Sequence, residues 1–390
     1  MDTAELKAEI VSVIDAHQEQ ITELSRKIHE NPEVGFHEVL AAAWLTDYLQ
    51  DKGFSIEHGT GGLATAFTAS YGQGKPVIAL IAEYDALPEL GHACGHNLIA
   101  ASATGAAIAA RAVTDQFNGN IMVIGTPAEE LHGGKAIMAS KGVFNSIDIA
   151  MMVHPSTVNT ATTETLALQV IDIEFTGKPA HAAARPEAGI NALDAMIQSF
   201  TAINSLRQHI RSTARVHGII TSGGEAPNIV PAHTAATFIV RAKEDDYLDE
   251  LKEKVLNCFM GASQATGAQL KYQWDSVRYA SIRNNLSLAR LFSRNMKSLG
   301  RRGVLSDPGS AFGSTDMGNV SQLLPSIHAR VAIARKQVLI HTPEFALAAI
   351  SEAGIKGMLD AAKAMAMTVA DLLTDGEAMN RVRTEFERGD

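Results

Sequence analysis

Cysteine is scarce in this chain, with only Cys94 and Cys258 among 390 residues. Two cysteines make no disulfide framework. Cys258 lies within an amphipathic helical pattern at 251–262, and we interpret it as a core thiol. The first twenty residues lack a basic segment followed by an apolar run, so we expect no signal peptide. The expected compartment is the cytoplasm, where a free Cys94 stays reduced.

Long apolar runs and an excess of positive charge are also missing. The longest low-charge stretch, 98–110, is too short and too weakly apolar to span a bilayer. The formal net charge of −10 argues against a nucleic-acid partner, since that affinity comes mainly from Lys and Arg. Serine-hydrolase (G-x-S-x-G) and phosphate-binding (Walker-type, G-x-G-x-x-G) motifs are absent. The composition is otherwise that of a globular protein long enough for two domains.

The segment Gly91–Asn97 packs two histidines and a cysteine into seven residues. The thiolate of Cys94 and the imidazole of His96 can both reach one metal ion or a pair of ions. Gly95 between them permits a sharp turn of the backbone. A lone cysteine is more often a buried thiol, so the metal interpretation requires further ligands elsewhere in the chain.

Candidate ligands follow three apolar segments that we expect to be strands, at 75–82, 120–125 and 147–153. The first is continuously apolar, as in a strand buried on both faces, and Asp85 follows it. Glu129 and Glu130 follow the second strand, and His154 follows the third. In open α/β sheets sites form at the carboxyl ends of the strands, so we expect these groups to meet there.

The pattern changes at residue 169. Alternating and helical patterns follow in the order β-α-β-β-α-β, which is typical of a ferredoxin-like unit inserted into a larger domain. We therefore expect an α/β fold with a mostly parallel central sheet flanked by helices, and an inserted α+β domain. The expected boundaries are 1–168, 169–276 and 277–390. We also expect one helix over 5–30, one over 346–373, and a frayed tail beyond Thr374.

The candidate ligands are one thiolate, three imidazoles and one carboxylate: Cys94, His96, Glu130, His154 and His341. Five ligands exceed the four of a tetrahedral zinc site and suit two metals that share a bridging ligand and a bridging water. Glu129 would then take the proton from that water. The residues alone therefore favour metal-assisted hydrolysis.

The chain resembles the di-metal amidohydrolases and peptidases that include aminoacylases, carboxypeptidase G and auxin-conjugate hydrolases. Within them it is most similar to the p-aminobenzoyl-glutamate hydrolase and β-alanyl-lysine dipeptidase branch. The resemblance covers nearly the whole chain. Its motifs are His29–Glu33, Glu83–Pro88, Gly91–Asn97, Pro127–Glu130, Gly177–His181, Ala226–Pro231, Ser314–Val320 and His341.

The resemblance implies a zinc-peptidase-like catalytic domain, a lid that forms a homodimer, and two divalent ions per chain. It assigns the ligands as follows: Cys94 bridging, His96 and His154 on one metal, Glu130 and His341 on the other. Glu129 would be the general base and acid, and Asp85 would orient a ligand. Thiolate and imidazole favour zinc, while manganese, cobalt and nickel fit the same donors.

Four further positions are candidates for contact with the substrate. His181 matches a lid histidine that reaches the partner subunit's site and steadies the oxyanion. Asn228 matches a lid asparagine near the substrate, and Arg241 a residue that holds a substrate carboxylate. Asp316 is either a supporting residue or a substrate-facing one. The residues alone favour an exposed turn position for His181, and only the resemblance favours the lid role. For Arg241, an exposed position at the end of a strand competes with the substrate-binding role.

Two positions depart from the family pattern. Asn97 stands where many relatives have an aspartate after Cys-Gly-His. Glu83 stands where more distant relatives carry a ligand histidine, so Cys94 and His96 would supply that metal instead.

The expected reaction is hydrolysis of an amide bond in a dipeptide, an N-acyl amino acid or an aminobenzoyl amino acid. One alternative is a hydrolase in which His92 or His96 activates Cys94 as the nucleophile. Another is a non-enzymatic metal- or ligand-binding protein on the same scaffold.

Overall fold

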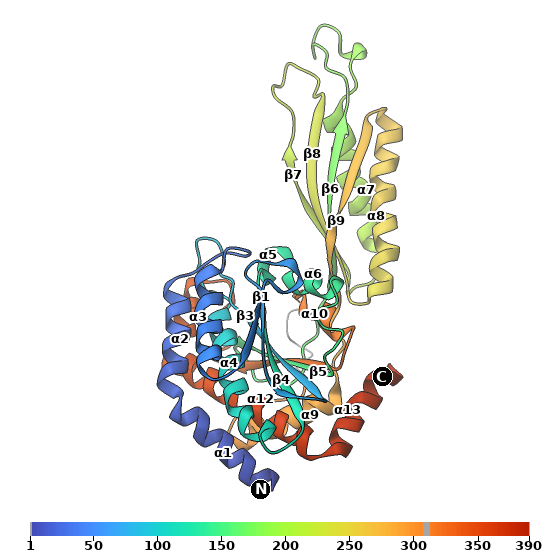
Figure 1. The fold of residues 1–390 in the computed structure, drawn as a ribbon. Coiled ribbons are helices and arrows are strands. Elements are labelled where there is room, and N and C mark those ends of the chain that lie inside the picture. Colours follow the sequence, from blue (N-terminus) through green and yellow to red (C-terminus); the bar gives the residue numbers. More distant parts are fainter. Residues whose placement is uncertain (1, 307–312, 390) are drawn as a thin grey trace. The chain divides into compact units, whose positions relative to one another are not determined.

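The computed structural model describes residues 2–306 and 313–389, which form two compact units (Figure 1). The first unit comprises residues 2–164, 282–306 and 315–389. The second comprises residues 165–281 and 313–314. The second unit is therefore inserted into the chain of the first.

The first unit contains a central sheet with the strand order β1-β2-β4-β3-β5-β10. β3, β4, β5 and β10 run parallel, while β1 and β2 are antiparallel additions at one edge. The strands are β1 (Ser55–His58), β2 (Phe67–Gln73), β3 (Val77–Glu83), β4 (Gly119–Thr126), β5 (Ile149–Ser156) and β10 (Ser326–Ala332). The helices are α1 (Thr3–Ala16), α2 (Gln18–Glu30), α3 (Val39–Asp51), α4 (His96–Thr114), α5 (Glu129–His132), α6 (Gly134–Ser140), α9 (Leu286–Ser298), α10 (Met317–Ser321), α11 (Pro343–Ala349), α12 (Glu352–Thr374) and α13 (Gly376–Arg388).

Strand β3 is buried along its whole length because both faces of the sheet are covered. Successive side chains of a strand point to opposite faces. Ile78 and Leu80 enter the core formed with α4 and α12, whereas Ala79 and Ile81 enter the core formed with α6 and α10. The same alternation directs Glu83, the last residue of the strand, toward α6 and α10.

Helix α4 is buried on all sides because its side chains are small. Alanine-rich α12 packs along it. At Gly105 a β-carbon would lie 2.8 Å from Cδ1 of Ile21 in α2, so a larger residue there would have to displace the end of that side chain. The helix that begins at His96 is therefore held rigidly from both sides.

The second unit is a four-stranded antiparallel sheet with the order β7-β8-β6-β9. Helices α7 and α8 pack on one face of it. The elements are β6 (Ala167–Thr176), α7 (Ala192–Leu206), β7 (Arg215–Ser222), β8 (His233–Ala242), α8 (Asp245–Thr266) and β9 (Gln269–Tyr279). Their order is the expected β-α-β-β-α-β. The predicted fold class, a mostly parallel α/β sheet with an inserted α+β unit, is confirmed.

Three expectations about helices were wrong in detail. The helix expected over 5–30 is broken at His17, which leaves the helical conformation between α1 and α2. The one expected over 346–373 is two helices, α11 and α12. The tail is not frayed, because Asp375 caps α13 and buried residues such as Val382 pack it against the core.

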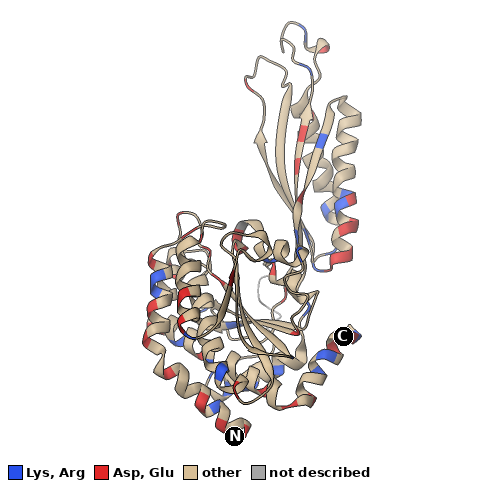
Figure 2. Ribbon diagram, in the orientation of Figure 1, with Lys and Arg blue, Asp and Glu red and all other residues tan. Residues whose placement is uncertain are grey.

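Charged residues of both signs are interspersed along the helices and do not gather on one of them (Figure 2). In the described part of the chain, no helix combines the length and the apolarity that crossing a bilayer requires.

Candidate metal centre

The Cys/His segment turns sharply at Gly95. This residue has a φ of +80°, and a β-carbon on it would lie 2.9 Å from Cγ of Pro155. Glycine is therefore required by both the left-handed backbone and the close approach to β5. The turn places Cys94 before α4 and His96 at its first residue, where both face the end of β5.

Asp85 fixes the orientation of His96. Nδ1 of His96 donates to Oδ1 of Asp85 at 2.9 Å and lies 2.9 Å from its backbone oxygen. Burial opposes a charge on His96, but the carboxylate of Asp85 and the neighbouring Cys94 outweigh it and raise the pKa of this imidazole. Nε2 of His96 is buried and has no hydrogen-bond partner among the described residues. This nitrogen is the one available to a metal.

His154 presents the same nitrogen. Its Nδ1 donates to the carbonyl of Pro155 at 2.6 Å, and its Nε2 lies 3.4 Å from Sγ of Cys94. Burial lowers the pKa of His154 to about 4, so the imidazole is neutral near pH 7. A neutral imidazole with a fixed tautomer is the form that binds metal ions.

Glu129 and Glu130 follow a left-handed residue, Ala128, whose φ is +59°. Two buried acceptors hold this bend: Glu38 Oε1 accepts from the Ala128 N–H at 2.8 Å, and Asp85 Oδ2 accepts from the Glu130 N–H at 3.0 Å. Both side chains reach His96. Glu130 Oε1 lies 3.9 Å from Nε2 of His96, and an oxygen of Glu129 lies within 4.8 Å of ligand atoms of His96 and Glu130. Glu129 also lies close to the carboxylates of Glu83 and Asp316.

His341 comes from a distant part of the chain but is tied to the Cys/His segment. Its backbone N–H donates to the Ala93 carbonyl at 3.0 Å. Nε2 of His341 lies 3.5 Å from Oε1 of Glu130. The backbone at His341 is left-handed, with a φ of +66°, which is unfavourable for a residue with a β-carbon.

The candidate ligand atoms converge. Among the described residues, ligand atoms within 4.8 Å of one another occur in these groups: Cys94, His96 and His154; Cys94, Glu130 and His341; His96, Glu129 and Glu130; and Glu83, Glu129 and Asp316. Cys94 and Glu130 each take part in more than one group, as expected for neighbouring ions. Within the described part of the chain, Nε2 of His96 and Oε1 of Glu130 are buried and make no hydrogen bond. Both atoms can donate a lone pair to a cation, so these residues fit a pair of divalent ions.

The electrostatics argue against a free cysteine nucleophile. Burial and the neighbouring carboxylate of Glu130 raise the pKa of the Cys94 thiol well above its usual value. A reactive cysteine requires the opposite shift. A divalent cation beside the sulfur would reverse the balance and stabilise the thiolate as a ligand.

Glu129 lies in a strongly anionic environment. Burial and the carboxylates of Glu83, Asp316 and Glu130 raise its pKa well above the usual value, and Lys135 acts in the opposite direction. Lys135 belongs to none of the motifs that predicted the site. Its partners are far away in sequence, so no local pattern could have revealed it. Asp316 is fully buried and paired with Lys135.

Asn97, which departs from the family pattern, faces away from the ligands. Its Nδ2 donates to Oγ of Ser25 at 2.9 Å, which ties α4 to α2. An amide can make this bond to a buried hydroxyl without introducing a charge.

The second unit brings His181 and Asn228 together but leaves Arg241 apart from them. Residues 181 and 229 form an isolated bridge, and the Ala182 N–H donates to the carbonyl of Asn228 at 3.0 Å. Arg241 lies at the far end of β8, where its Nη1 donates to Oγ of Ser314 at 3.2 Å. Within this unit Arg241 is thus separated from His181 by the length of a strand.

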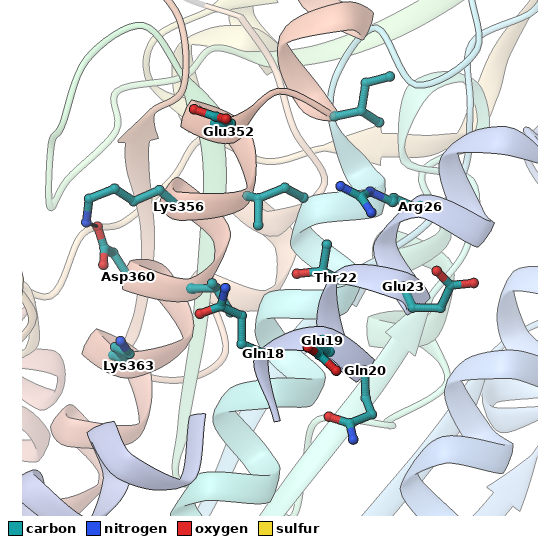
Figure 3. A pocket seen from close by; sticks show the side chains of 13 residues that line it. Gln18, Glu19, Gln20, Thr22, Glu23, Arg26, Glu352, Lys356, Asp360 and Lys363 are labelled. Carbon is teal, nitrogen blue, oxygen red and sulfur yellow. Dashed lines mark hydrogen bonds and ion pairs between the residues drawn. The ribbon is translucent and has the colours of Figure 1, made fainter. Parts of the chain in front are cut away.

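A large cavity lies elsewhere in the first unit. Its volume is about 800 Å³, and it lies between α2 and α12, with charged residues along its walls (Figure 3). The labelled side chains include Glu19, Glu23, Arg26, Lys356, Asp360 and Lys363. None of the candidate ligands lines it, so it is distinct from the metal centre.

Comparison with known proteins agrees with the fold. Residues 168–263 match the peptidase dimerisation domain. The chain is 36% identical to the Xaa-Arg dipeptidase of Mus musculus over 98% of its length and 92% of the relative. It is 30% identical to a component of the p-aminobenzoyl-glutamate hydrolase of Escherichia coli, over 97% of this chain and 94% of the relative.

Among solved structures, the chain shares its fold with a dinuclear metal-binding peptidase of the M20 family from Bacillus subtilis. The TM-score is 0.72 at 20% identity, with 92% of this chain and 99% of that chain covered. The fold, the ligand set and the relatives define the protein as a metal-dependent hydrolase of amide bonds. The chain belongs to the M20 family of metallopeptidases.

Proposed function

We propose that the chain hydrolyses the amide bond of a dipeptide, an N-acyl amino acid or an aminobenzoyl amino acid that carries a free carboxylate. The observation that carries this proposal is the convergence of imidazole, thiolate and carboxylate donors beside Glu129. A dipeptide ending in arginine is the first candidate, because the Xaa-Arg dipeptidase of mouse is 36% identical over nearly the whole chain.

We assign Cys94 as the bridging ligand, with His96 and His154 on one ion and Glu130 and His341 on the other. The two overlapping groups that share Cys94 support this division. Thiolate and imidazole donors favour zinc. Because Cys94 binds as a thiolate, the protein would work in a reducing compartment such as the cytoplasm.

Divalent ions bound there would polarise the scissile carbonyl and acidify the attacking water. Glu129 would take the proton from that water and deliver it to the leaving amine. Its position supports this role, because an oxygen of Glu129 lies within 4.8 Å of ligand atoms of His96 and Glu130. Asp85 would hold His96 and the backbone of Glu130 in place for both ions.

The residues of the inserted unit would bind the substrate. His181 is exposed, and its Nδ1 accepts from the N–H groups of Ala183 and Ala184 at 3.3 and 3.2 Å. Its Nε2 therefore carries the proton and can donate to an oxyanion. Asn228 would contact the substrate beside it, and Arg241 would hold a substrate carboxylate. Asp316 is paired with Lys135, which favours a role in holding the site together over direct contact with the substrate.

We further propose that residues 1–168 and 277–390 form the catalytic domain, and that residues 169–276 form a lid through which two chains dimerise. β7 is an edge strand of the second sheet, and its Ile219 and Ile220 are 67% and 41% exposed. An exposed apolar edge strand is suited to pairing with another strand. The matched peptidase dimerisation domain covers the same segment.

The test is turnover of a mixed pool that contains Xaa-Arg dipeptides, N-acyl amino acids and p-aminobenzoyl-glutamate, followed by mass spectrometry. The pool is incubated with enzyme before and after chelation, and again after zinc or manganese is restored. We expect selective loss of one class of pool member, stopped by the chelator and restored by the metal. Turnover that persists after complete metal removal would contradict the proposal, as would no turnover with either metal.

A further inference from the structure

A lysine is buried beneath the metal centre. The side chain of Lys135, in α6, is fully inaccessible to solvent. Its Nζ lies 2.6 Å from Oε1 of Glu83 and 2.6 Å from Oδ1 of Asp316. Asp316 also accepts from the backbone N–H of Lys135 at 2.7 Å. A buried ammonium loses its hydration, so it persists only where carboxylates compensate for that loss.

The same carboxylates surround Glu129. One oxygen each from Glu83, Asp316 and Glu129 lie within 4.8 Å of one another, and we call these three residues the carboxylate cage. Oxygen ligands at such separations can converge on a hard cation such as Mn²⁺ or Ca²⁺. In this protein the ammonium of Lys135 lies against two of the three members of the cage.

The cage also touches the proposed ligands. Oε2 of Glu83 lies 3.5 Å from Nε2 of His96, and Glu129 is adjacent in sequence to Glu130. Divalent ions would therefore bind next to an anionic cluster that could itself hold one. An ion captured by the cage would bind Glu129 and remove it from proton transfer.

We propose that Lys135 is a positioning residue whose ammonium fills the carboxylate cage and thereby keeps divalent ions off Glu129. The inference rests on the proposed function, because it takes Glu129 as the base. A covalently attached cation balances Glu83 and Asp316 permanently and cannot be exchanged for a metal ion.

The test counts metal ions in Lys135→Ala, with Lys141→Ala as the control. Lys141 follows the same helix and is exposed. Each protein is loaded with Mn²⁺, freed of excess by gel filtration and analysed by mass spectrometry for manganese per chain. We expect equal counts for wild type and Lys141→Ala, and one additional ion in Lys135→Ala. A folded Lys135→Ala with the wild-type count would overturn the inference.

Kinetics supply a second readout. Capture of Glu129 should lower kcat of Lys135→Ala about 100-fold, the scale of general-base catalysis, with little change in KM. Ethylammonium is small enough to substitute for the deleted side chain. It should restore part of kcat and displace the additional ion. Recovery of kcat without loss of the ion would contradict the mechanism.

A double variant covers the case in which Lys135→Ala does not fold. Lys135→Ala/Asp316→Asn removes one cation and one anion. The carboxylate cage then keeps only the carboxylates of Glu83 and Glu129. We expect it to fold with the wild-type count of Mn²⁺. A double variant that gains an ion or does not fold overturns the inference. Failure of the proposed function would instead appear in the wild type, as absent or metal-independent turnover.

Discussion

The carboxylate of Asp85 accepts a hydrogen bond from Nδ1 of His96 at 2.9 Å, and this bond leaves Nε2 as the only nitrogen that His96 can offer a metal. The second oxygen of Asp85 accepts the backbone N–H of Glu130 at 3.0 Å. One side chain thus orients two proposed ligands that are 34 residues apart in the sequence.

We expect Asp85→Asn to weaken metal binding by about 10- to 100-fold, the usual effect of losing a partner that orients a ligand. The amide has one oxygen for two N–H donors, so either His96 or Glu130 would face an NH₂ group. The measurement is a competition titration of the metal-free chain against a chromophoric chelator. Asp47→Asn, on the exposed face of α3, is the control. Unchanged affinity in Asp85→Asn would remove the orienting role.

The neighbouring residues Glu129 and Glu130 form a matched pair for a second prediction. Glu129→Gln should lower kcat about 10²- to 10⁴-fold while keeping the metal content of the wild type, because only proton transfer is lost. Glu130→Gln should lose bound metal as well as activity, since it removes a charged ligand. Steady-state kinetics and metal analysis of both variants separate the roles. Wild-type turnover in Glu129→Gln would exclude it as the base.

A third prediction concerns the edge strand β7. Ile219→Lys should convert a dimer into a monomer, because a charged side chain on an exposed edge opposes strand pairing. Leu347→Lys, on α11 of the first unit, changes a side chain with nearly the same exposure, 66% against 67%, and should stay dimeric. Light scattering after size-exclusion chromatography gives both masses. An Ile219→Lys dimer would argue for another interface.

A fourth prediction concerns stability against acid. Asp148 accepts from the Val77 N–H at 2.8 Å and pairs with Lys75 and Arg383, each at 3.0 Å. Partial burial acts against it, but these partners lower the pKa of Asp148 below its usual 3.8. A carboxyl with a lowered pKa in the folded state stabilises the fold at higher pH, and this contribution is lost as the pH falls through that pKa.

Asp148→Asn should therefore lower the free energy of unfolding by about 1 kcal/mol at pH 7. The difference from wild type should be the same at pH 5 and smaller at pH 3. Urea unfolding at the three pH values measures it. A difference that grows toward pH 3 would show that Asp148 acts in some other way.

The sequence was most informative where structure depends on local patterns. The continuous apolar run at 75–82 predicted a strand buried on both faces, and β3 is that strand. The candidate ligands stood next to expected strands or helices, so a parallel sheet was enough to suggest that they meet. By contrast, the break at His17 falls within an apolar repeat that continues from Ile14 to Ile21, and periodicity cannot detect it.

Long-range charge pairs are the other part that sequence could not provide. Lys135 contacts Asp316, which is 181 residues away, and Glu83, which lies earlier in the chain on another element. Neither pairing creates a spacing or a composition that a motif would capture. The relation of His181 to Asn228 was likewise hidden, because it depends on a bridge between two loops of the inserted unit.

The left-handed backbone at His341 lowers the conformational stability of the chain at the position of a proposed metal ligand. Holding a residue with a β-carbon in that conformation costs on the order of 1 kcal/mol, and a side chain that is 52% exposed recovers little of it by packing. Folding alone would prefer glycine there. Directed evolution for heat resistance without an assay for activity would therefore tend to replace this histidine. An enzyme selected in that way would be more stable than its parent but would lack a proposed metal ligand.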